Sequence, residues 1–380
     1  MKRIYFLDHL RSLMILLVIV YHTQFIFTSG LLNSWVIISE TKSENLGLIG
    51  MYLDTFVMFT FFYIAGFFIA HSAKNNNYKE LIRSKLKRII LPWLFGILII
   101  IPIYKILFLF NRGLPQEEWF SYFHFYKRIG TDLSLFSNDP NQNWLWFLPV
   151  LFLFQMCYLL LHRFKLLNNN LSISKAIAYT FILSIAYSML ISKLGFKGWT
   201  LGVLLDFQNE RLLPYLLFFL LGTKSYQLEH FSKPLSKTPY IVSNIIMSIG
   251  ITIYTTVGLN LFYNIIDPTR EYYFISSFGD RLVYYSSIYL CTLSFMHILI
   301  YPYFKYLNRP INWMKTINRN SYYIYIVHMV VMGVVAIPVL KLGIPNILSY
   351  FIIILLTFIG SHLLVNLYYS VKASLFNKHK

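Results

Sequence analysis

The stretch YFLDHLRSLMILLVIVYHTQF, residues 5–25, reads as a membrane-spanning helix that carries Arg11 and His22 inside an apolar run. The two residues are eleven positions apart, and a helix turns about 100° per residue, so their side chains lie within about 20° of one face. They are about 16 Å apart along that face, roughly half the thickness of the hydrocarbon layer. Ionisable groups at such depth point into a protein interior or a wet cavity, so they indicate a functional site.

The same pattern also has an explanation that needs no site. Arg11 would snorkel to the lipid headgroups, and His22 would cap the far end of the helix. This segment alone leaves both explanations open, and the rest of the chain has to decide between them.

The composition places the whole chain in the membrane class. Of its 380 residues, 57% are hydrophobic and 13% are charged, which is far from the average of soluble globular proteins. We therefore predict an all-α, polytopic integral membrane bundle of about ten transmembrane helices. The predicted spans are 10–28, 51–71, 89–110, 144–161, 175–192, 211–228, 241–264, 282–304, 320–340 and 347–369. The span near residue 211 is short, because Pro214 and the polar sequence DFQNER interrupt it.

The domain organisation follows from these spans. We expect residues 1–372 to form a single membrane domain and residues 373–380 to form a basic cytoplasmic tail. The first span lacks a small-residue cleavage site, so it is expected to be retained and not removed as a signal peptide. The longest extramembrane stretch, about residues 111–143, is long enough to cover a polar acceptor. The two cysteines lie in apolar spans without zinc-binding spacing, so no metal site is predicted.

The distribution of charge predicts the orientation. If the N-terminus is cytoplasmic and the loops alternate, the inner loops hold 22 of the 33 basic residues and three of the 15 acids. Lys and Arg are enriched in cytoplasmic loops, so we expect a bacterial inner-membrane protein with both termini in the cytoplasm. The net charge of +18 does not indicate a nucleic-acid partner, because the bases are spread over loops that face anionic lipid.

A second basic feature follows the second span. Six Lys and Arg residues occupy positions 74–88, and Lys85 and Arg88 project from the same side of a helix. They can lie at the same cytoplasmic opening of the bundle as Arg11. Several fixed cations at an inner mouth are what the phosphates of a nucleotide require. A positive anchor on the inner leaflet explains the cluster without a ligand.

Together these segments resemble a known family. FLDHLRSLMILLVIVYHT is similar to the first-helix signature of the membrane acyltransferase-3 family, an arginine and a histidine separated by ten residues. Five later segments resemble further motifs of that family in the same order. They are FFYIAGFFIAHS around Gly66, LIRSKLKRIILPW, NWLWFLPVLFLFQ, LPYLLFFLLG and NRNSYYIYIVHMVV. The likeness covers essentially the whole chain and is greatest for the branch that succinylates osmoregulated periplasmic glucans. The chain departs from the family at Lys85, usually arginine, and at Ala65, usually serine.

The resemblance implies a membrane O-acyltransferase. It would move an acetyl or succinyl group from cytosolic acyl-CoA, a co-substrate and not a permanently bound cofactor, to a hydroxyl of an extracytoplasmic carbohydrate or glucan. Its other partners would be the lipid bilayer and the glycan-synthesis machinery. Arg11, Lys85 and Arg88 would hold the phosphates of coenzyme A. His22, the catalytic residue together with Arg11, would accept the proton of the attacking hydroxyl or carry the acyl group itself.

Further polar residues are open to two interpretations. His328 and Tyr325 are candidates for acceptor binding, but for His328 we favour an interior histidine that is hydrogen-bonded to a neighbouring helix. The lone histidines His297 and His362 favour the interior explanation. Asp206, Glu210 and Arg211 mark the edges of outer loops and predict either sugar contacts or ion pairs.

Two other function classes fit a ten-helix chain. A sugar exporter or secondary transporter would also carry intramembrane charges and a basic inner face. It should show carboxylate relays, whereas almost all acids of this chain are placed outside. A scaffold subunit of a glycan synthase agrees with everything except the polar stripe formed by Arg11 and His22.

Overall fold

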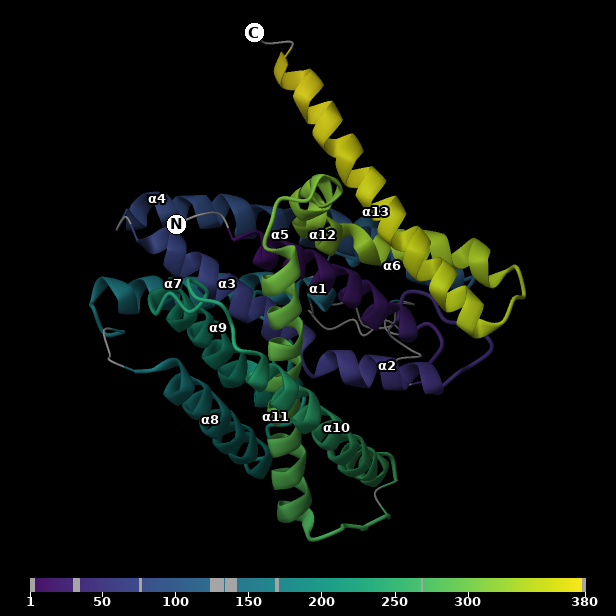
Figure 1. Ribbon diagram of the computed structural model, residues 1–380. Coiled ribbons are helices and arrows are strands. Elements are labelled where there is room, and N and C mark those ends of the chain that lie inside the picture. Colours follow the sequence, from purple (N-terminus) through teal and green to yellow (C-terminus); the bar gives the residue numbers. More distant parts are fainter. Residues whose placement is uncertain are drawn as a thin grey trace.

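The computed structural model describes residues 4–29, 35–74, 77–123, 133, 142–167, 171–267 and 269–377. Two predicted features lie partly outside the described residues. They are the basic tail, at residues 378–380, and the outer loop, at residues 124–132 and 134–141. Figure 1 shows a bundle made almost entirely of helices. In chain order the elements are α1 (Tyr5–Gln24), α2 (Asn45–Asp54), α3 (Val57–Ala73), α4 (Tyr78–Lys85), η1 (Leu86–Ile90), α5 (Leu91–Phe95), η2 (Gly96–Ile100), α6 (Ile101–Asn111), η3 (Trp119–Tyr122), η5 (Asn143–Trp146), α7 (Phe147–Arg163), α8 (Ile173–Lys193), β1 (Trp199–Thr200), β2 (Phe207–Gln208), η6 (Asn209–Arg211), α9 (Leu212–Gln227), α10 (Lys237–Ile266), α11 (Ser277–Leu307), α12 (Asn312–Leu340) and α13 (Asn346–Asn377).

The helices confirm the predicted fold class. Within the described residues, nine helical stretches are long and apolar enough to cross a membrane, and they coincide with nine of the ten predicted spans. The predicted span 211–228 corresponds to α9, which has 16 residues and is shorter than the about 20 residues that a bilayer requires. The chain is therefore an all-α, multi-pass membrane protein.

The second span is broken, which the sequence did not predict. Residues 51–71 were expected to form one helix, but α2 ends at Asp54 and α3 begins at Val57. Figure 1 shows that the two helices run in different directions. The Thr55 carbonyl at the break accepts a hydrogen bond of 2.5 Å from the Thr292 hydroxyl of α11. This bond satisfies a backbone group that the break leaves buried, and the break leaves Asp54 at a helix end.

The third span is one long helix with two wider turns. Two stretches of π-helix, η1 and η2, separate α4, α5 and α6. Pro92 and Pro102 each lie in the first turn of the α-helical segment that follows a wide turn. Proline cannot donate a backbone hydrogen bond and clashes with the preceding turn of a regular helix. The wide turns therefore let the helix continue past both prolines.

Two glycines set the spacing between α3 and α9. A Cβ atom added to Gly66 would lie 1.9 Å from the carbonyl oxygen of Phe219, and one added to Gly222 would lie 2.0 Å from the carbonyl oxygen of Tyr63. Only glycine permits this approach of two backbones, which is a recurring device in membrane helix packing. Two of the motifs that resemble the family, those around Gly66 and Gly222, thus meet at one helix crossing.

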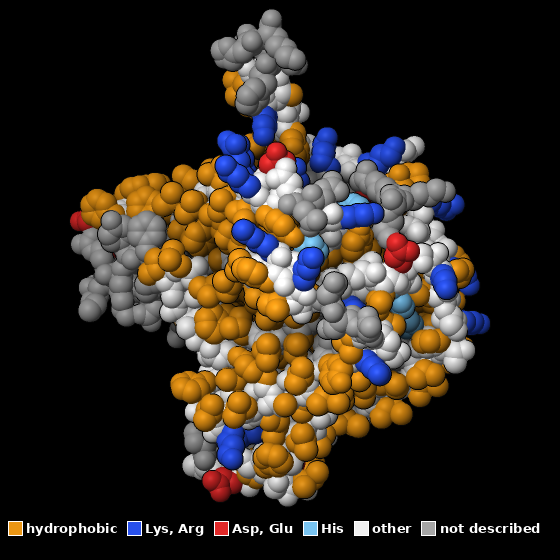
Figure 2. Space-filling model, turned by 90° about the vertical axis from the view of Figure 1, so that its left-hand side faces the viewer, with side chains coloured by type: hydrophobic (Ala, Val, Ile, Leu, Met, Phe, Trp, Pro, Cys, Tyr) orange, Lys and Arg blue, Asp and Glu red, His pale blue; other side chains and the backbone are white. Residues whose placement is uncertain are grey.

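The bundle has two polar faces. In Figure 1, α1 begins and α13 ends on the upper side, which we call the terminal face, and the connections α8–α9 and α10–α11 lie at the opposite face. Figure 2 shows Lys and Arg side chains gathered over the upper part of the molecule, above a largely hydrophobic surface. The concentration of basic residues on the terminal face agrees with the alternation from which the orientation was predicted.

Candidate active site

The centre of the candidate site is a pair of histidines from α1 and α12. His22 Nδ1 lies 2.8 Å from His328 Nε2, and the two rings are nearly parallel, with an angle of 9° between their planes. The side chain of His328 is fully buried. The structure thus supports the interpretation of His328 as an interior histidine bonded to a neighbouring helix, and the neighbour is the predicted catalytic residue.

The backbone of α12 determines which nitrogen of each ring carries a proton. His328 Nδ1 lies 2.7 Å from the carbonyl oxygen of Tyr325, and a carbonyl can only accept. In the neutral pair, His328 therefore donates through Nδ1 and accepts through Nε2. His22 must then donate through Nδ1, so its Nε2 keeps a lone pair. This nitrogen can accept a proton or attack an electrophile.

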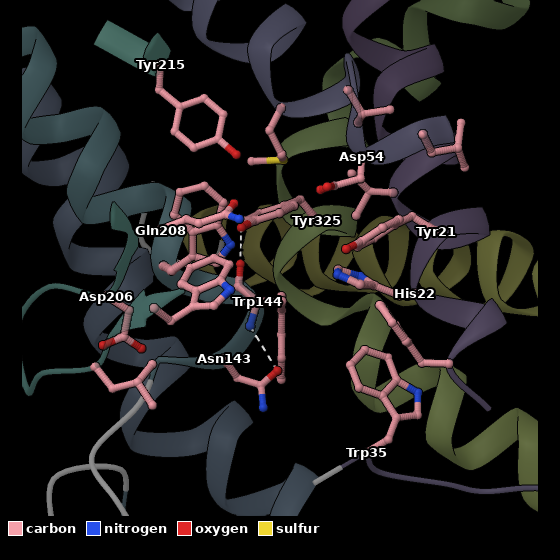
Figure 3. Close-up of a pocket in the computed structure, with 18 residues that line it drawn as sticks. Tyr21, His22, Trp35, Asp54, Asn143, Trp144, Asp206, Gln208, Tyr215 and Tyr325 are labelled. Carbon is pink, nitrogen blue, oxygen red and sulfur yellow. Dashed lines mark hydrogen bonds between the residues drawn. The ribbon is translucent and has the colours of Figure 1, made fainter. Parts of the chain in front are cut away.

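His22 lines a cavity of about 360 Å³. In Figure 3, Tyr21 and His22 from α1 and Asp54 from α2 enter the cavity from one side, and Trp144, Asp206 and Gln208 lie across from them. Four of the seven tryptophans of the chain line this cavity, namely Trp35, Trp144, Trp146 and Trp199. Aromatic faces with a few carboxylates and amides are suited to a polar ligand that also has apolar faces. We call this space the aromatic cavity.

An ion pair forms part of the wall of the aromatic cavity. Arg211 Nη2 lies 2.7 Å from Asp54 Oδ2, and the Arg211 side chain is 7% exposed whereas that of Asp54 is 32% exposed. Arg211 also donates to the Asp54 carbonyl over 3.2 Å. Of the two predictions for Arg211, sugar contact or ion pair, the structure supports the ion pair. Sequence reasoning missed Asp54, because nothing in the surrounding residues marks the helix break that exposes it.

Asp206 joins two loops at the rim of the aromatic cavity. Its carboxylate accepts a hydrogen bond from the Gln142 backbone N–H and another, of 2.8 Å, from the Gly202 N–H. Burial raises the pKa of Asp206 to about 6, although the backbone hydrogen bonds from Gln142 and Gly202 act in the opposite direction. The carboxylate thus holds the hairpin β1–β2 against the start of η5. It makes backbone contacts and also lines the cavity.

Trp35 is held against the histidine by Arg112, a residue that the sequence did not single out. Arg112 Nη2 donates to the Trp35 carbonyl over 3.0 Å, and Nη1 donates to the Val36 carbonyl over 3.3 Å. The centroids of the Trp35 and His22 rings lie 5.7 Å apart. Arg112 therefore fixes one wall of the aromatic cavity from outside it.

A second cavity of about 640 Å³ opens among the residues of the terminal face. It brings together the three residues predicted to bind a donor, Arg11, Lys85 and Arg88. Lys87, Lys315 and Arg319 also line it, and no Asp or Glu does so among the described residues. We call this space the basic cavity. Six cations gathered in one lining attract a multiply charged anion, but the binding of a donor there stays a prediction.

Arg11 is fixed by its own helix and by α12. Its Nη2 donates to the Asn318 carbonyl over 3.0 Å and lies 3.7 Å from Asp8 Oδ1. The local ion pair with Asp8 is the one that i, i+3 spacing makes available on a helix. These contacts point the guanidinium group toward the basic cavity.

The remaining predicted residues have clear positions. Tyr325 lines both cavities, and its contact with an acceptor stays a prediction. His328 lines neither of them and lies behind His22. His297 and His362 line neither cavity. His362 Nδ1 lies 3.4 Å from Asn320 Nδ2 of α12, as the interior explanation expects, whereas the buried His297 Nε2 has no hydrogen-bond partner among the described residues. The Glu210 carboxylate accepts a hydrogen bond of 3.0 Å from the Gly198 backbone N–H, next to the hairpin β1–β2.

Comparisons with known proteins identify a family and relatives of this chain. A family model described as "Acyltransferase domain" matches residues 4–366. The chain is 27% identical over 255 residues to Glucans biosynthesis protein C of Escherichia coli (strain K12), and equally to that of Shigella boydii serotype 4 (strain Sb227). The alignments cover 63% of this chain and 62% of each relative, so the chain matches about three fifths of their length. No solved structure matches.

Proposed function

Because this chain belongs to the acyltransferase family whose model spans residues 4–366, we propose that it moves an acyl group from acyl-CoA to a hydroxyl of a carbohydrate. Membership in the family makes the protein an acyltransferase and decides against the exporter and the scaffold. The donor, the acceptor and the residues that bind them are our proposal. The observation that carries it is the pair of chemically different cavities that share Tyr325 in their lining, one of which is also lined by His22.

The basic cavity suits coenzyme A. Its phosphates carry several negative charges, which match a lining that holds six cations. Arg11 and Arg88 offer planar forks that can bind phosphate oxygens in pairs, and Lys85 adds a point charge. Lysine at position 85 keeps the charge that the family usually supplies with arginine.

The aromatic cavity suits a neutral sugar. The faces of tryptophan rings stack on the apolar faces of sugar rings, and the amides of Asn143 and Gln208 can exchange hydrogen bonds with hydroxyl groups. Asp206 places a carboxylate in the lining, whereas Arg211 balances the charge of the partly exposed Asp54. The Asp206 carboxylate opposes a phosphorylated or carboxylated acceptor through like-charge repulsion. We therefore assign this cavity to a neutral carbohydrate such as a glucan.

The chemistry uses the free lone pair of His22. The acceptor hydroxyl gives its proton to His22 Nε2 while its oxygen bonds to the thioester carbon, and the carbon–sulfur bond then breaks. The proton passes to the leaving thiolate, so His22 returns to its neutral form. The same lone pair could instead attack the thioester carbon, which breaks the carbon–sulfur bond, releases the coenzyme A thiolate and leaves the acyl group on Nε2. The sugar hydroxyl would then bond to the acyl carbon as the carbon–nitrogen bond breaks, and its proton would pass to the thiolate.

The location is part of the same proposal. We place the protein in the inner membrane of a bacterium, with the terminal face and both termini in the cytoplasm, beside the glycan-synthesis machinery. Cytosolic acyl-CoA would then meet the basic cavity, and a glycan outside would meet the aromatic cavity. Only the acyl group has to pass between the faces.

The test is transfer by the purified protein in lipid vesicles. The wild type, His22→Ala and His362→Ala are incubated with acetyl-CoA or succinyl-CoA and β-glucan oligosaccharides. We measure thiol release, and we detect the acylated sugar by mass spectrometry. His362 is the matched control because this helix histidine lines neither cavity. The proposal expects ester formation by the wild type and the control but not by His22→Ala. Full ester formation by folded His22→Ala would remove His22 from the chemistry.

A further inference from the structure

A single residue lines both cavities. Among the residues that line the aromatic cavity and the basic cavity, only Tyr325 belongs to both sets. Its hydroxyl donates to the Trp144 carbonyl, as the dashed line in Figure 3 shows. The Trp144 indole N–H donates in return to the Ile326 carbonyl over 3.1 Å. Two hydrogen bonds thus join the start of η5 to α12 where the cavities meet.

The contact is packed on both sides. The Phe147 ring, which lines the basic cavity, meets the Tyr325 ring edge to face with 5.9 Å between centroids. Trp144 lines the aromatic cavity and is 3% exposed. The packed side chains of Tyr325, Trp144 and Phe147 thus lie between the two linings, and we call these three residues the partition.

The partition stands in the path of the donor. Arg11 lines the basic cavity and His22 lines the aromatic cavity, about 16 Å further along the same helix. A donor whose phosphates lie at Arg11 can present its thioester to His22 only by passing Tyr325. Rotation of the Tyr325 side chain would open this path without moving its backbone carbonyl. The hydrogen bond from His328, and with it the protonation of His22, would therefore be preserved.

We propose that Tyr325 determines whether the thioester is transferred or hydrolysed. This inference rests on the proposed function. While its hydroxyl is hydrogen-bonded to the Trp144 carbonyl, Tyr325 keeps the thioester away from His22 and from any water that enters the aromatic cavity. An acceptor that stacks on Trp144 disturbs this contact and admits the thioester when a hydroxyl is in place.

The competing reaction differs only in the nucleophile. If the partition opens without an acceptor, a water molecule gives a proton to His22 Nε2 and its oxygen bonds to the thioester carbon. The carbon–sulfur bond breaks, and the products are the free carboxylic acid and the thiol of coenzyme A. A closed partition therefore protects acyl-CoA from loss.

The variant Tyr325→Phe tests the inference, because it keeps the ring and removes the hydrogen bond to Trp144. Thiol release from acetyl-CoA and succinyl-CoA is measured without acceptor. Loss of one buried hydrogen bond should raise this rate by about two- to tenfold. The matched control is Tyr350→Phe. The hydroxyl of Tyr350 donates to the Val20 carbonyl over 3.0 Å, and Tyr350 lines neither cavity. Unchanged acceptor-free hydrolysis in Tyr325→Phe would overturn the inference.

A second measurement does not depend on catalysis. Met58→Cys places a thiol in the aromatic cavity, and Phe68→Cys places one in the basic cavity. An impermeant thiol reagent is added to the terminal face of the protein in vesicles. Met58→Cys should react faster when combined with Tyr325→Phe than alone, whereas Phe68→Cys should react equally in both backgrounds. Equal rates for Met58→Cys would exclude the partition. If labelling changes but no variant releases thiol, the partition stands and the proposed donor is wrong.

Discussion

His22 Nδ1 and His328 Nε2 are 2.8 Å apart although the two residues are 306 positions apart in the sequence. The contact joins the first long helix to the one before the last. It converts an isolated histidine into one with a defined donor nitrogen and a defined acceptor nitrogen. A base prepared in this way does not have to reorient when the acceptor arrives.

The pair predicts that His328 acts through His22. His328→Ala leaves the Nδ1–H of His22 without its acceptor, so the fraction of His22 with a free Nε2 falls. We expect kcat to fall by about ten- to a hundredfold, which is less than the full contribution of general base catalysis because His22 itself remains. KM for acyl-CoA should stay the same, because His328 lines neither cavity.

The control for this prediction is His328→Gln. The glutamine side-chain oxygen can accept the hydrogen bond from His22, so this variant should recover part of kcat. A purely structural role for His328 would instead lower the melting temperature and would not distinguish the two variants by kcat. Equal kcat in the wild type and His328→Ala contradicts the assignment.

Arg11 predicts the behaviour of the donor site. Arg11→Ala removes one of the cations in the basic cavity and should raise KM for acyl-CoA about tenfold or more. Arg11→Lys should restore only part of the affinity, because a point charge cannot replace a planar fork. KM and its dependence on salt are measured, with Arg163→Ala as a control at an exposed arginine outside both cavities. Identical KM values for all variants would place Arg11 outside the donor site.

Asp206 predicts a dependence of stability on pH. Its pKa is about 6 in the folded protein against about 3.9 for an unfolded aspartate. A carboxyl group with a raised pKa binds its proton more tightly in the folded state, so its contribution to stability is lost as the pH rises from about 4 to about 6. Asp206→Asn cannot titrate and should remove this part of the pH dependence.

Melting temperatures at pH 4.5 and pH 7.5 check the Asp206 prediction. The melting temperature at pH 7.5 minus that at pH 4.5 should be a few degrees higher in Asp206→Asn than in the wild type. Glu210→Gln is the control, since Glu210 serves the same hairpin. The prediction is wrong if the melting temperatures of the wild type and Asp206→Asn respond identically to pH.

The contact between α3 and α9 predicts which glycines tolerate a methyl group. An alanine side chain at Gly66 would meet the backbone oxygen of Phe219 at 1.9 Å, and a backbone atom cannot move aside as a side chain can. We expect Gly66→Ala to destabilise the protein by about 1–3 kcal/mol or more. Gly47→Ala is the control, because its nearest neighbour would be a Thr28 methyl group at 3.4 Å. Thermal unfolding in detergent compares the two, and equal melting temperatures would count against the close crossing.

Much of the fold was accessible from the sequence because hydrophobic runs of about 20 residues are a strong local signal. The side chains of Arg11 and His22 could be placed on one stripe for the same reason, since both belong to one helix. α9 was harder, because its 16 residues are fewer than a complete span. The break after Asp54 was missed because it depends on Thr292 of another helix, which supplies the hydrogen bond that makes it tolerable.

The partners of the site residues could not be predicted, because they are tertiary contacts. His328 meets His22, and Arg211 meets Asp54, only after α12 and α9 have packed against the first helices. The tryptophans of the aromatic cavity come from the segment at residue 35, from η5 and from the hairpin. No periodicity in the sequence connects these three segments.

The last prediction concerns orientation, on which transfer across the membrane depends. Lys79 of α4 is exposed near the terminal face, and Glu118 is exposed in the segment that follows α6. With a cytoplasmic terminal face, Lys79→Cys should be protected from an impermeant thiol reagent in intact cells, and Glu118→Cys should react. The wild type controls for background, because Cys157 and Cys291 lie within α7 and α11. Both new thiols should react after the membrane is opened with detergent. The reverse pattern would place the basic cavity outside, where cytosolic acyl-CoA cannot reach it, and the proposed direction of transfer would have to be abandoned.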